Sequence, residues 1–259
     1  MPLEHYPQPA YALLDDEELL WRYMKVRTFE RFIVNGELYF SRADQFDDDA
    51  YEGLPPEQYV RDVAARMGPG TSFEHSWGEL KNNRQGSFVS CWSSHKSIYM
   101  WEKFAREGVA VQTNVGLLKA ALDAVPARTM IGRIRYSNVP AGYNILRFVT
   151  TKRLQYAPEK EVRAMAWDMT LSPSNPYQHE SPKGLVFRAN IAALAQQVII
   201  SPHAPTDLLE KVQTLLATHG YDQIPVVRSK FTGFSHLLPT KDDIDKLMVE
   251  ELKRLSAAK

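Results

Sequence analysis

A glutamate and an arginine two residues apart are the pair in this sequence best suited to chemistry. Glu161 and Arg163 lie in the run 161–167, whose alternation predicts a strand with both side chains on one face. A neighbouring arginine keeps a carboxylate ionised, and a fixed carboxylate beside a sugar stabilises a developing oxocarbenium ion. The alternative is an exposed ion pair of at most about 1 kcal/mol. The spacing fits both interpretations.

A second arginine, Arg22, lies on a predicted strand directly before a helix, within Trp21-Arg22-Tyr23. The fixed fork of guanidinium donors suits a phosphate group or a ribose hydroxyl. The alternative is an ordinary strand arginine in a salt bridge. This residue is therefore a candidate ligand-binding group.

Small polar residues at the end of another strand form the third candidate. Ser93 and Ser94 end the segment 90–94, and Trp101 follows on the next predicted helix. A polar strand end followed by an aromatic residue can line a pocket that stacks a flat ring. The alternative is that Trp92 and Trp101 are core aromatics.

The acidic loop Asp47-Asp48-Asp49, with Glu52, is the only metal candidate that we single out. Its oxygens can bind Mg²⁺, but they match no ligand spacing pattern, and a solvated loop of turn-capping residues is the alternative. No two histidines are four residues apart, and one cysteine, Cys91, excludes a cysteine-rich zinc site. P-loop, GxSxG, HExxH and Rossmann signatures are absent. We therefore expect no metal.

The composition bounds the classes of partner. Basic and acidic residues number 31 each, so the formal net charge is zero. That balance argues against a general electrostatic attraction to nucleic acid or membrane, although a local patch stays compatible with it. A single cysteine suits a reducing cytoplasm. The N-terminus lacks the pattern of a signal peptide, and no apolar run approaches the ~18 residues of a membrane span. We expect a cytoplasmic protein without a membrane partner.

The elements that must position these residues alternate between strands and helices. Segment 20–24 is a strand, 26–33 a helix closed by Asn35-Gly36, and 37–42 an aromatic strand. A long loop or helical insertion occupies 54–86. Beyond it we expect strands at 88–92, 109–113, 131–136, 161–167 and 185–191, with helices after the caps Ser97 and Asn114 and at 145–154.

The last third predicts a β-α-β unit. Strands at 198–200 and 224–228 flank an amphipathic helix that Thr206-Asp207 caps, and a charged helix follows at 240–259. We see no repeat and no linker. The predicted fold class is α+β (mixed α/β): one domain over 1–259, with a central mixed sheet flanked by helices.

These segments, in this order, resemble the bacterial domain of unknown function 2971 family over roughly residues 18–230. That family typically shows a Tyr-Arg-Tyr strand, a Leu-Tyr-Phe-Ser strand, a Ser-Cys-Phe-Ser strand, a Met-Trp helix and a Glu-x-Glu-Trp-Arg strand. The matching segments here are Trp21-Arg22-Tyr23, Leu38-Tyr39-Phe40-Ser41, Ser90-Cys91-Trp92-Ser93, Met100-Trp101 and Glu159-Lys160-Glu161-Val162-Arg163. The acidic loop departs from the family pattern, since it loses a proline and gains a residue.

The order of elements also resembles, more loosely, the plan of ADP-ribosyltransferases. That resemblance implies NAD as a substrate and a late glutamate that promotes departure of nicotinamide. Carried over, the catalytic residues would be Glu161 and Arg163. The NAD-binding residues would be Arg22, Tyr39, Ser93, Ser94 and Trp101.

Three functions follow as hypotheses. The first is an ADP-ribosyltransferase-like, NAD-consuming enzyme, such as a bacterial toxin or phage-defence effector. Its acceptor would be protein, nucleic acid or water, and a partner protein would neutralise it. The second is a metal-dependent nuclease or hydrolase built on Asp47, Asp48, Glu52 and Glu159. The third is a non-catalytic ligand- or partner-binding module.

Overall fold

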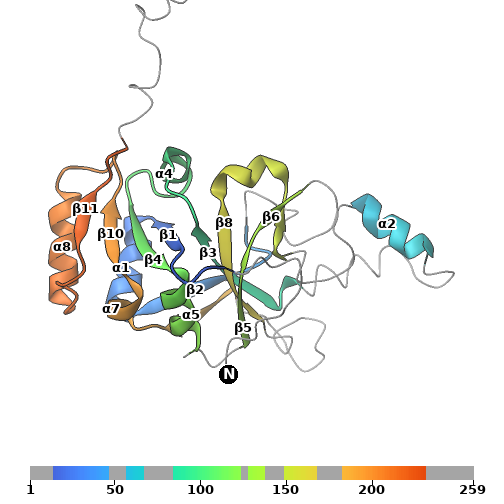
Figure 1. Ribbon diagram of the computed structural model, residues 1–259, viewed down its shortest axis with the longest axis horizontal. Coiled ribbons are helices and arrows are strands. Elements are labelled where there is room, and N and C mark those ends of the chain that lie inside the picture. Colours follow the sequence, from blue (N-terminus) through green and yellow to red (C-terminus); the bar gives the residue numbers. More distant parts are fainter. Residues whose placement is uncertain are drawn as a thin grey trace, which may run out of the picture.

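The computed structural model describes residues 14–46, 57–66, 84–123, 128–137, 149–167 and 183–231. Within these ranges the chain forms a nine-stranded mixed sheet and a separate pair of short strands (Figure 1). The predicted helix 240–259, the acidic loop 47–52 and most of the insertion 54–86 lie outside them. The predicted α+β class with a central mixed sheet is confirmed.

The large sheet has the order β11-β10-β4-β1-β3-β2-β9, with β8 on β3 and β5 on β8. Its strands are β1 (Leu19–Met24), β2 (Glu37–Arg42), β3 (Ser87–Ser93), β4 (Val109–Asn114), β5 (Arg128–Arg133), β8 (Glu161–Trp167), β9 (Gly184–Arg188), β10 (Gln197–Ile200) and β11 (Val226–Arg228). The parallel pair β6 (Arg135–Tyr136) and β7 (Thr151–Lys152) forms the small sheet.

The helices are α1 (Val26–Asn35), α2 (Glu57–Arg66), α4 (Ile98–Phe104), α5 (Val115–Asp123), α7 (Ile191–Leu194) and α8 (Leu208–Thr218), with the 3-10 helix η1 (Leu154–Glu159). Local signals set several of their ends. Gly36 closes α1 at φ 63°, a left-handed conformation that glycine adopts at little cost. The side chains of Ser97 and Asn114 accept hydrogen bonds from backbone N–H groups in the first turns of α4 and α5.

The predicted β-α-β unit is present, because β10 and β11 are parallel and α8 connects them. Its helix begins as expected after Asp207, but this side chain makes no capping hydrogen bond and instead pairs with Lys211 at 2.7 Å. Another prediction is wrong. The helix predicted at 145–154 does not extend through Thr151–Lys152, which form β7. That stretch pairs with β6, and tertiary pairing has overridden its helical pattern.

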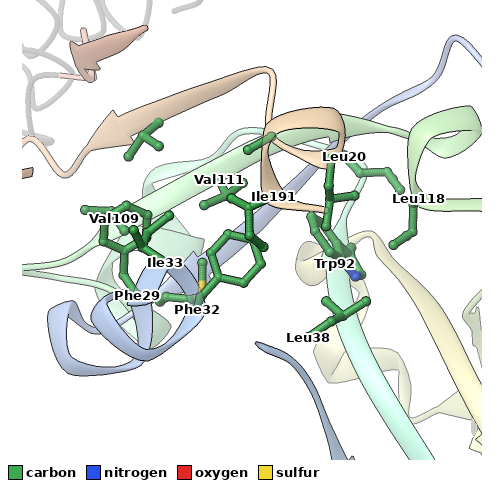
Figure 2. Close-up of a cluster of buried hydrophobic side chains, with 14 of the residues drawn as sticks. Leu20, Phe29, Phe32, Ile33, Leu38, Trp92, Val109, Val111, Leu118 and Ile191 are labelled. Carbon is green, nitrogen blue, oxygen red and sulfur yellow. The ribbon is translucent and has the colours of Figure 1, made fainter. Parts of the chain in front are cut away.

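The main core lies between one face of the sheet and the helices α1, α5, α7 and α8. Figure 2 shows the α1 side chains Phe29, Phe32 and Ile33 gathered with sheet residues such as Val111, all of them fully or nearly fully buried. The opposite face carries a smaller cluster, in which Trp101 of α4 packs with sheet residues such as Ile199. The sheet is therefore covered on both faces along β1, β4 and β10.

The neighbours of β3 change along its length. Ser93, at its end, pairs with Trp21 of β1, whereas Val89, near its beginning, pairs with Ser41 of β2. The other edge of β3 pairs with β8 along all of its residues. β1 and β2 therefore share one edge of β3 and separate along it. We call this separation of β1 from β2 the fork.

No helix within the described ranges is long and apolar enough to cross a membrane.

Candidate functional site

A pocket of about 220 Å³ opens at the fork. Strands β1, β2, β3 and β8 meet around it, and α4, β7 and η1 complete its wall. An adjoining pocket of about 570 Å³ lies beside α1 and shares Arg22, Tyr23, Ser41 and Phe104 with the first. The wall of the first pocket is partly apolar, with the side chains of Phe46, Trp92, Met100 and Phe104.

Glu161 lines this pocket and is held by Arg163 of the same strand. Arg163 Nε lies 2.7 Å from Glu161 Oε1, and Nη2 lies 3.1 Å from Oε2. The predicted shared face is thus confirmed. The alternative of an exposed pair is wrong, because Arg163 is fully buried and Glu161 is only 3% exposed. Strand β8 lies between β3 and β5, so neither edge of the strand reaches solvent at this pair.

A lysine that the sequence did not single out completes the charge cluster. Lys152 of β7 is buried, with Nζ 2.7 Å from Glu159 Oε2 and 3.1 Å from Glu161 Oε2. Glu159 also receives Lys103 of α4, at 2.6 Å from Oε1. The ion pairs therefore run from α4 through η1 and β7 to β8. Lys152 fell within the helix predicted at 145–154, and no sequence signal marked it as a site residue.

The electrostatics of the cluster show how strongly its members interact. Burial raises the pKa of Glu161, and the charge of Lys152 opposes this shift. Burial alone would lower the pKa of Lys152, but the carboxylates of Glu161 and Glu159 outweigh it and raise that pKa above its usual value. Lys152 is therefore charged at neutral pH. It favours the ionised form of Glu161 against the cost of burial.

Cys91 lies opposite Arg163 in the β3–β8 pairing and also lines the pocket. Burial raises the pKa of its thiol well above the usual range, and the nearby charge of Glu161 raises it further. A neutral thiol is a weak nucleophile, in agreement with the interpretation of this cysteine as a strand residue. It supplies a hydrogen bond to the Glu161 carboxylate.

Arg22 reaches across the fork. Its Nη2 donates to the carbonyl oxygen of Tyr39 on β2 at 2.8 Å, and its guanidinium lies 5.7 Å from the ring centre of Trp92. Its Nη1 is buried and has no hydrogen-bond partner among the described residues. Burial lowers the pKa of Arg22 to about 10, which leaves it charged at neutral pH. Arg22 also lines the pocket, so its guanidinium is a candidate partner for a ligand acceptor atom.

The two serines occupy different positions. Ser93 lines the pocket, with Oγ 2.7 Å from the carbonyl oxygen of Glu159. Ser94 does not line it. Ser94 Oγ instead donates to the carbonyl oxygen of Lys160 at 2.9 Å, and its N–H donates to the same oxygen at 2.8 Å. Ser94 thus fastens the turn between η1 and β8.

Trp101 does not line either pocket. It is 2% exposed and meets Tyr23 edge to face, with ring centres 4.8 Å apart. Its core position supports the alternative interpretation of this tryptophan. The side chains that α4 does present to the pocket are Met100 and Phe104, one turn apart. A ligand ring in the pocket would therefore meet Phe104 rather than Trp101.

Tyr39 lines only the pocket beside α1, where its phenol lies over Gly184. A Cβ at Gly184 would collide with this phenol, so a larger residue there would displace the Tyr39 ring. The structure thus brings Arg22, Ser93 and Glu161 to one pocket and Tyr39 to its neighbour. Arg163 supports Glu161 from behind.

The metal hypothesis has little support in the described part of the chain. Asp47, Asp48 and Glu52 lie outside it. Its remaining member, Glu159, is engaged by two lysines at 2.6 and 2.7 Å, which compete with a cation for the carboxylate oxygens. Within the described ranges, no cluster of three His, Cys, Asp or Glu side chains could hold a metal ion.

No family model, curated protein or solved structure matches this chain. The resemblances to the domain of unknown function 2971 family and to ADP-ribosyltransferases therefore stay predictions from sequence.

Proposed function

We propose that this chain is an NAD-consuming enzyme of ADP-ribosyltransferase type, whose reaction takes place in the pocket at the fork. The observation that carries the proposal is the meeting of two groups in one pocket. One is the carboxylate of Glu161, fixed by Arg163 and Lys152. The other is the guanidinium of Arg22, which lines the same pocket and whose Nη1 has no hydrogen-bond partner among the described residues.

The chemistry assigned to Glu161 is electrostatic. When the bond between nicotinamide and ribose breaks, positive charge develops on the ribose, and a carboxylate at a fixed position stabilises it. Arg163 and Lys152 hold the carboxylate so that little reorganisation is needed. Arg22 would bind a ribose hydroxyl or a phosphate oxygen of NAD, and Phe104 would contact one of its flat rings.

The biological setting that we propose is a cytoplasmic bacterial toxin or phage-defence effector. Such an enzyme transfers ADP-ribose to a protein or a nucleic acid, or consumes NAD by hydrolysis. A neutralising partner protein would then protect the cell that makes it.

The test is nicotinamide release from NAD, together with thermal unfolding in the presence and absence of millimolar NAD. We expect wild type to be stabilised by NAD and to release nicotinamide. Glu161→Gln keeps the size of the side chain but loses its charge, so it should bind NAD and release no nicotinamide. Glu210→Gln, at an exposed position of α8, is the matched control and should behave as wild type. Undiminished release by Glu161→Gln would refute the assignment.

The second candidate is a ligand-binding module without catalysis. Both oxygens of Glu161 already have partners, which is the arrangement of a structural carboxylate. Stabilisation by a nucleotide with no nicotinamide release from wild type would favour this candidate. Equal binding by wild type and Arg22→Gln would exclude the fork pocket as its site.

A further inference from the structure

Lys152 contacts both glutamates of the cluster from a strand of only two residues. Its Nζ lies 2.7 Å from Glu159 Oε2 and 3.1 Å from Glu161 Oε2. The side chain is 5% exposed, so water contributes little to the solvation of either charge. We propose that Lys152 is a positioning residue that keeps Glu161 ionised and oriented in the pocket. The inference rests on the proposed function for its role in catalysis, but its physical content can be tested without NAD.

The turn at Lys160 brings the two carboxylates to the same ammonium group. Lys160 has φ 45° and ψ 48°, a left-handed conformation that is unfavourable for a non-glycine residue. Its carbonyl oxygen accepts from the N–H and the Oγ of Ser94, which hold the turn in place. Strained backbone of this kind persists where the surroundings fix it, often at functional sites. Here it directs Glu159 from η1 and Glu161 from β8 toward Lys152.

The groups that face Glu161 come from every element around it. Arg163 of β8 donates to both oxygens, and Cys91 of β3 donates from its thiol. Tyr136 of β6 accepts from the Glu161 N–H at 2.7 Å, and Glu159 of η1 adds a like charge. Burial and this like charge both favour the neutral form of Glu161.

The charge of Lys152 favours the ionised form of Glu161 against burial and the charge of Glu159. Arg163 has a second role besides its bonds to Glu161. Arg163 also donates from Nη1 to the carbonyl oxygen of Val149 at 2.7 Å, and therefore fastens the chain before β7 as well. Lys152 shares its ammonium between the two carboxylates, so its removal changes the charge beside Glu161 and leaves the bond from Arg163 to Val149 in place.

Lys152 also connects the Glu161 carboxylate, through Glu159, to the apolar wall of the pocket. Lys103 of α4 pairs with Glu159 Oε1 at 2.6 Å, and Glu159 in turn pairs with Lys152. Helix α4 presents Met100 and Phe104 to the pocket. A ligand that displaces α4 would therefore change the surroundings of Glu161 through this chain of ion pairs.

The experiment follows the carboxyl group of Glu161 itself. Protein labelled with ¹³C at glutamate side-chain carboxyls is titrated by NMR, and the Glu161 signal is assigned by its loss in Glu161→Gln. Removal of the positive charge in Lys152→Met should raise the pKa of Glu161 by roughly 1–3 units. Lys152→Arg keeps the charge and should restore most of the wild-type titration.

A second variant predicts the opposite sign. Glu159→Gln removes the like charge that faces Glu161 and leaves Lys152 with Glu161 as its charged partner, so the pKa of Glu161 should fall. If the cluster were merely structural, Lys152→Met and Glu159→Gln would both lower stability, and the pKa of Glu161 would not shift in opposite directions. If Lys152→Met does not fold, the direction of the shift in Glu159→Gln decides the question.

An unchanged or lowered pKa of Glu161 in folded Lys152→Met would overturn the inference, as would a raised or unchanged pKa in Glu159→Gln. With NAD, the acidic limb of the pH profile for nicotinamide release should move to higher pH in Lys152→Met and to lower pH in Glu159→Gln. If wild type releases no nicotinamide, the proposed function fails, and the carboxyl titration still decides the role of Lys152.

Discussion

The segments β10–α8–β11 and β7–η1–β8 each join two strands through one helix. The first buries apolar side chains, and the second buries charged ones. In the first, Leu208, Val212 and Leu216 are buried, and the ion pair Asp207–Lys211 is exposed. In the second, the buried residues include the charged Lys152, Glu159, Glu161 and Arg163.

This difference means that burial stabilises the fold more in the α8 segment than in the β7–η1–β8 segment. Burial of apolar surface contributes roughly 25 cal/mol per Å², which is the source of stability in the α8 unit. A buried ion pair often contributes less than well-packed apolar residues of similar volume, because each charge loses its hydration. Departures of this kind from the simplest folding rules are expected where a protein binds or reacts. On the proposed function, the β7–η1–β8 segment is such a place.

The largest effect that we expect comes from breaking the buried pair. Arg163→Met removes the guanidinium that donates to both oxygens of the nearly buried Glu161 carboxylate, so it should destabilise the protein by about 4 kcal/mol. Urea unfolding measures the change. Lys211→Met, which breaks the exposed pair of α8, is the control and should leave the midpoint unchanged. Similar urea midpoints for Arg163→Met and Lys211→Met would mean that the buried pair contributes no more to stability than the exposed one.

A cavity in the β10–α8–β11 segment should lower the stability of the protein without altering the pocket at the fork. Leu216→Ala in α8 removes a side chain that is 1% exposed and should destabilise the protein by about 3 kcal/mol. Gln213→Ala, at an exposed position of the same helix, should have little effect. Below the unfolding transition, nicotinamide release and NAD binding by Leu216→Ala should equal those of wild type. Impaired turnover in the folded variant would show that the α8 unit is coupled to the pocket.

The smallest expected effect is a change in thiol reactivity. Burial and the charge of Glu161 both raise the pKa of Cys91, so its thiolate is scarce at pH 8.5 and alkylation by iodoacetamide should be slower than in urea-unfolded protein. Glu161→Gln removes one of these causes, which lowers the pKa and should speed alkylation several-fold. The chain has one cysteine, so mass spectrometry reports this site alone. An unchanged rate would show that Glu161 does not control the thiol.

Much of the local structure was predictable because it depends on short-range signals. The alternation in 161–167 placed Glu161 and Arg163 on one face, and Gly36 closed α1 where its left-handed conformation was needed. These features depend on residues within a few positions of each other. The same is true of the caps at Ser97 and Asn114.

The face that α4 presents to the pocket was not predictable in this way. Met100 and Phe104 lie on one stripe of the helix, and Trp101 lies on another that is equally apolar. Which stripe faces the core depends on how the helix packs against β1, β4 and β10, and β1 and β10 are distant from α4 in sequence. The sequence therefore indicated an aromatic helix beside the site but selected the wrong side chain for the pocket.

The sequence by itself determined most strands, most helices and the shared face of Glu161 and Arg163, because periodicity and capping are properties of neighbouring residues. Only the tertiary structure decided that this pair is buried, since its burial requires β3 and β5 on both edges of β8. It also decided that Arg22 meets Glu161 at the fork and that Lys152 bridges two glutamates. Arg22 and Glu161 are far apart in the chain, so only strand order and register bring them to one pocket. Lys152 is close in sequence to its two glutamates, and the pairing of β7 with β6 and the turn at Lys160 bring it to them.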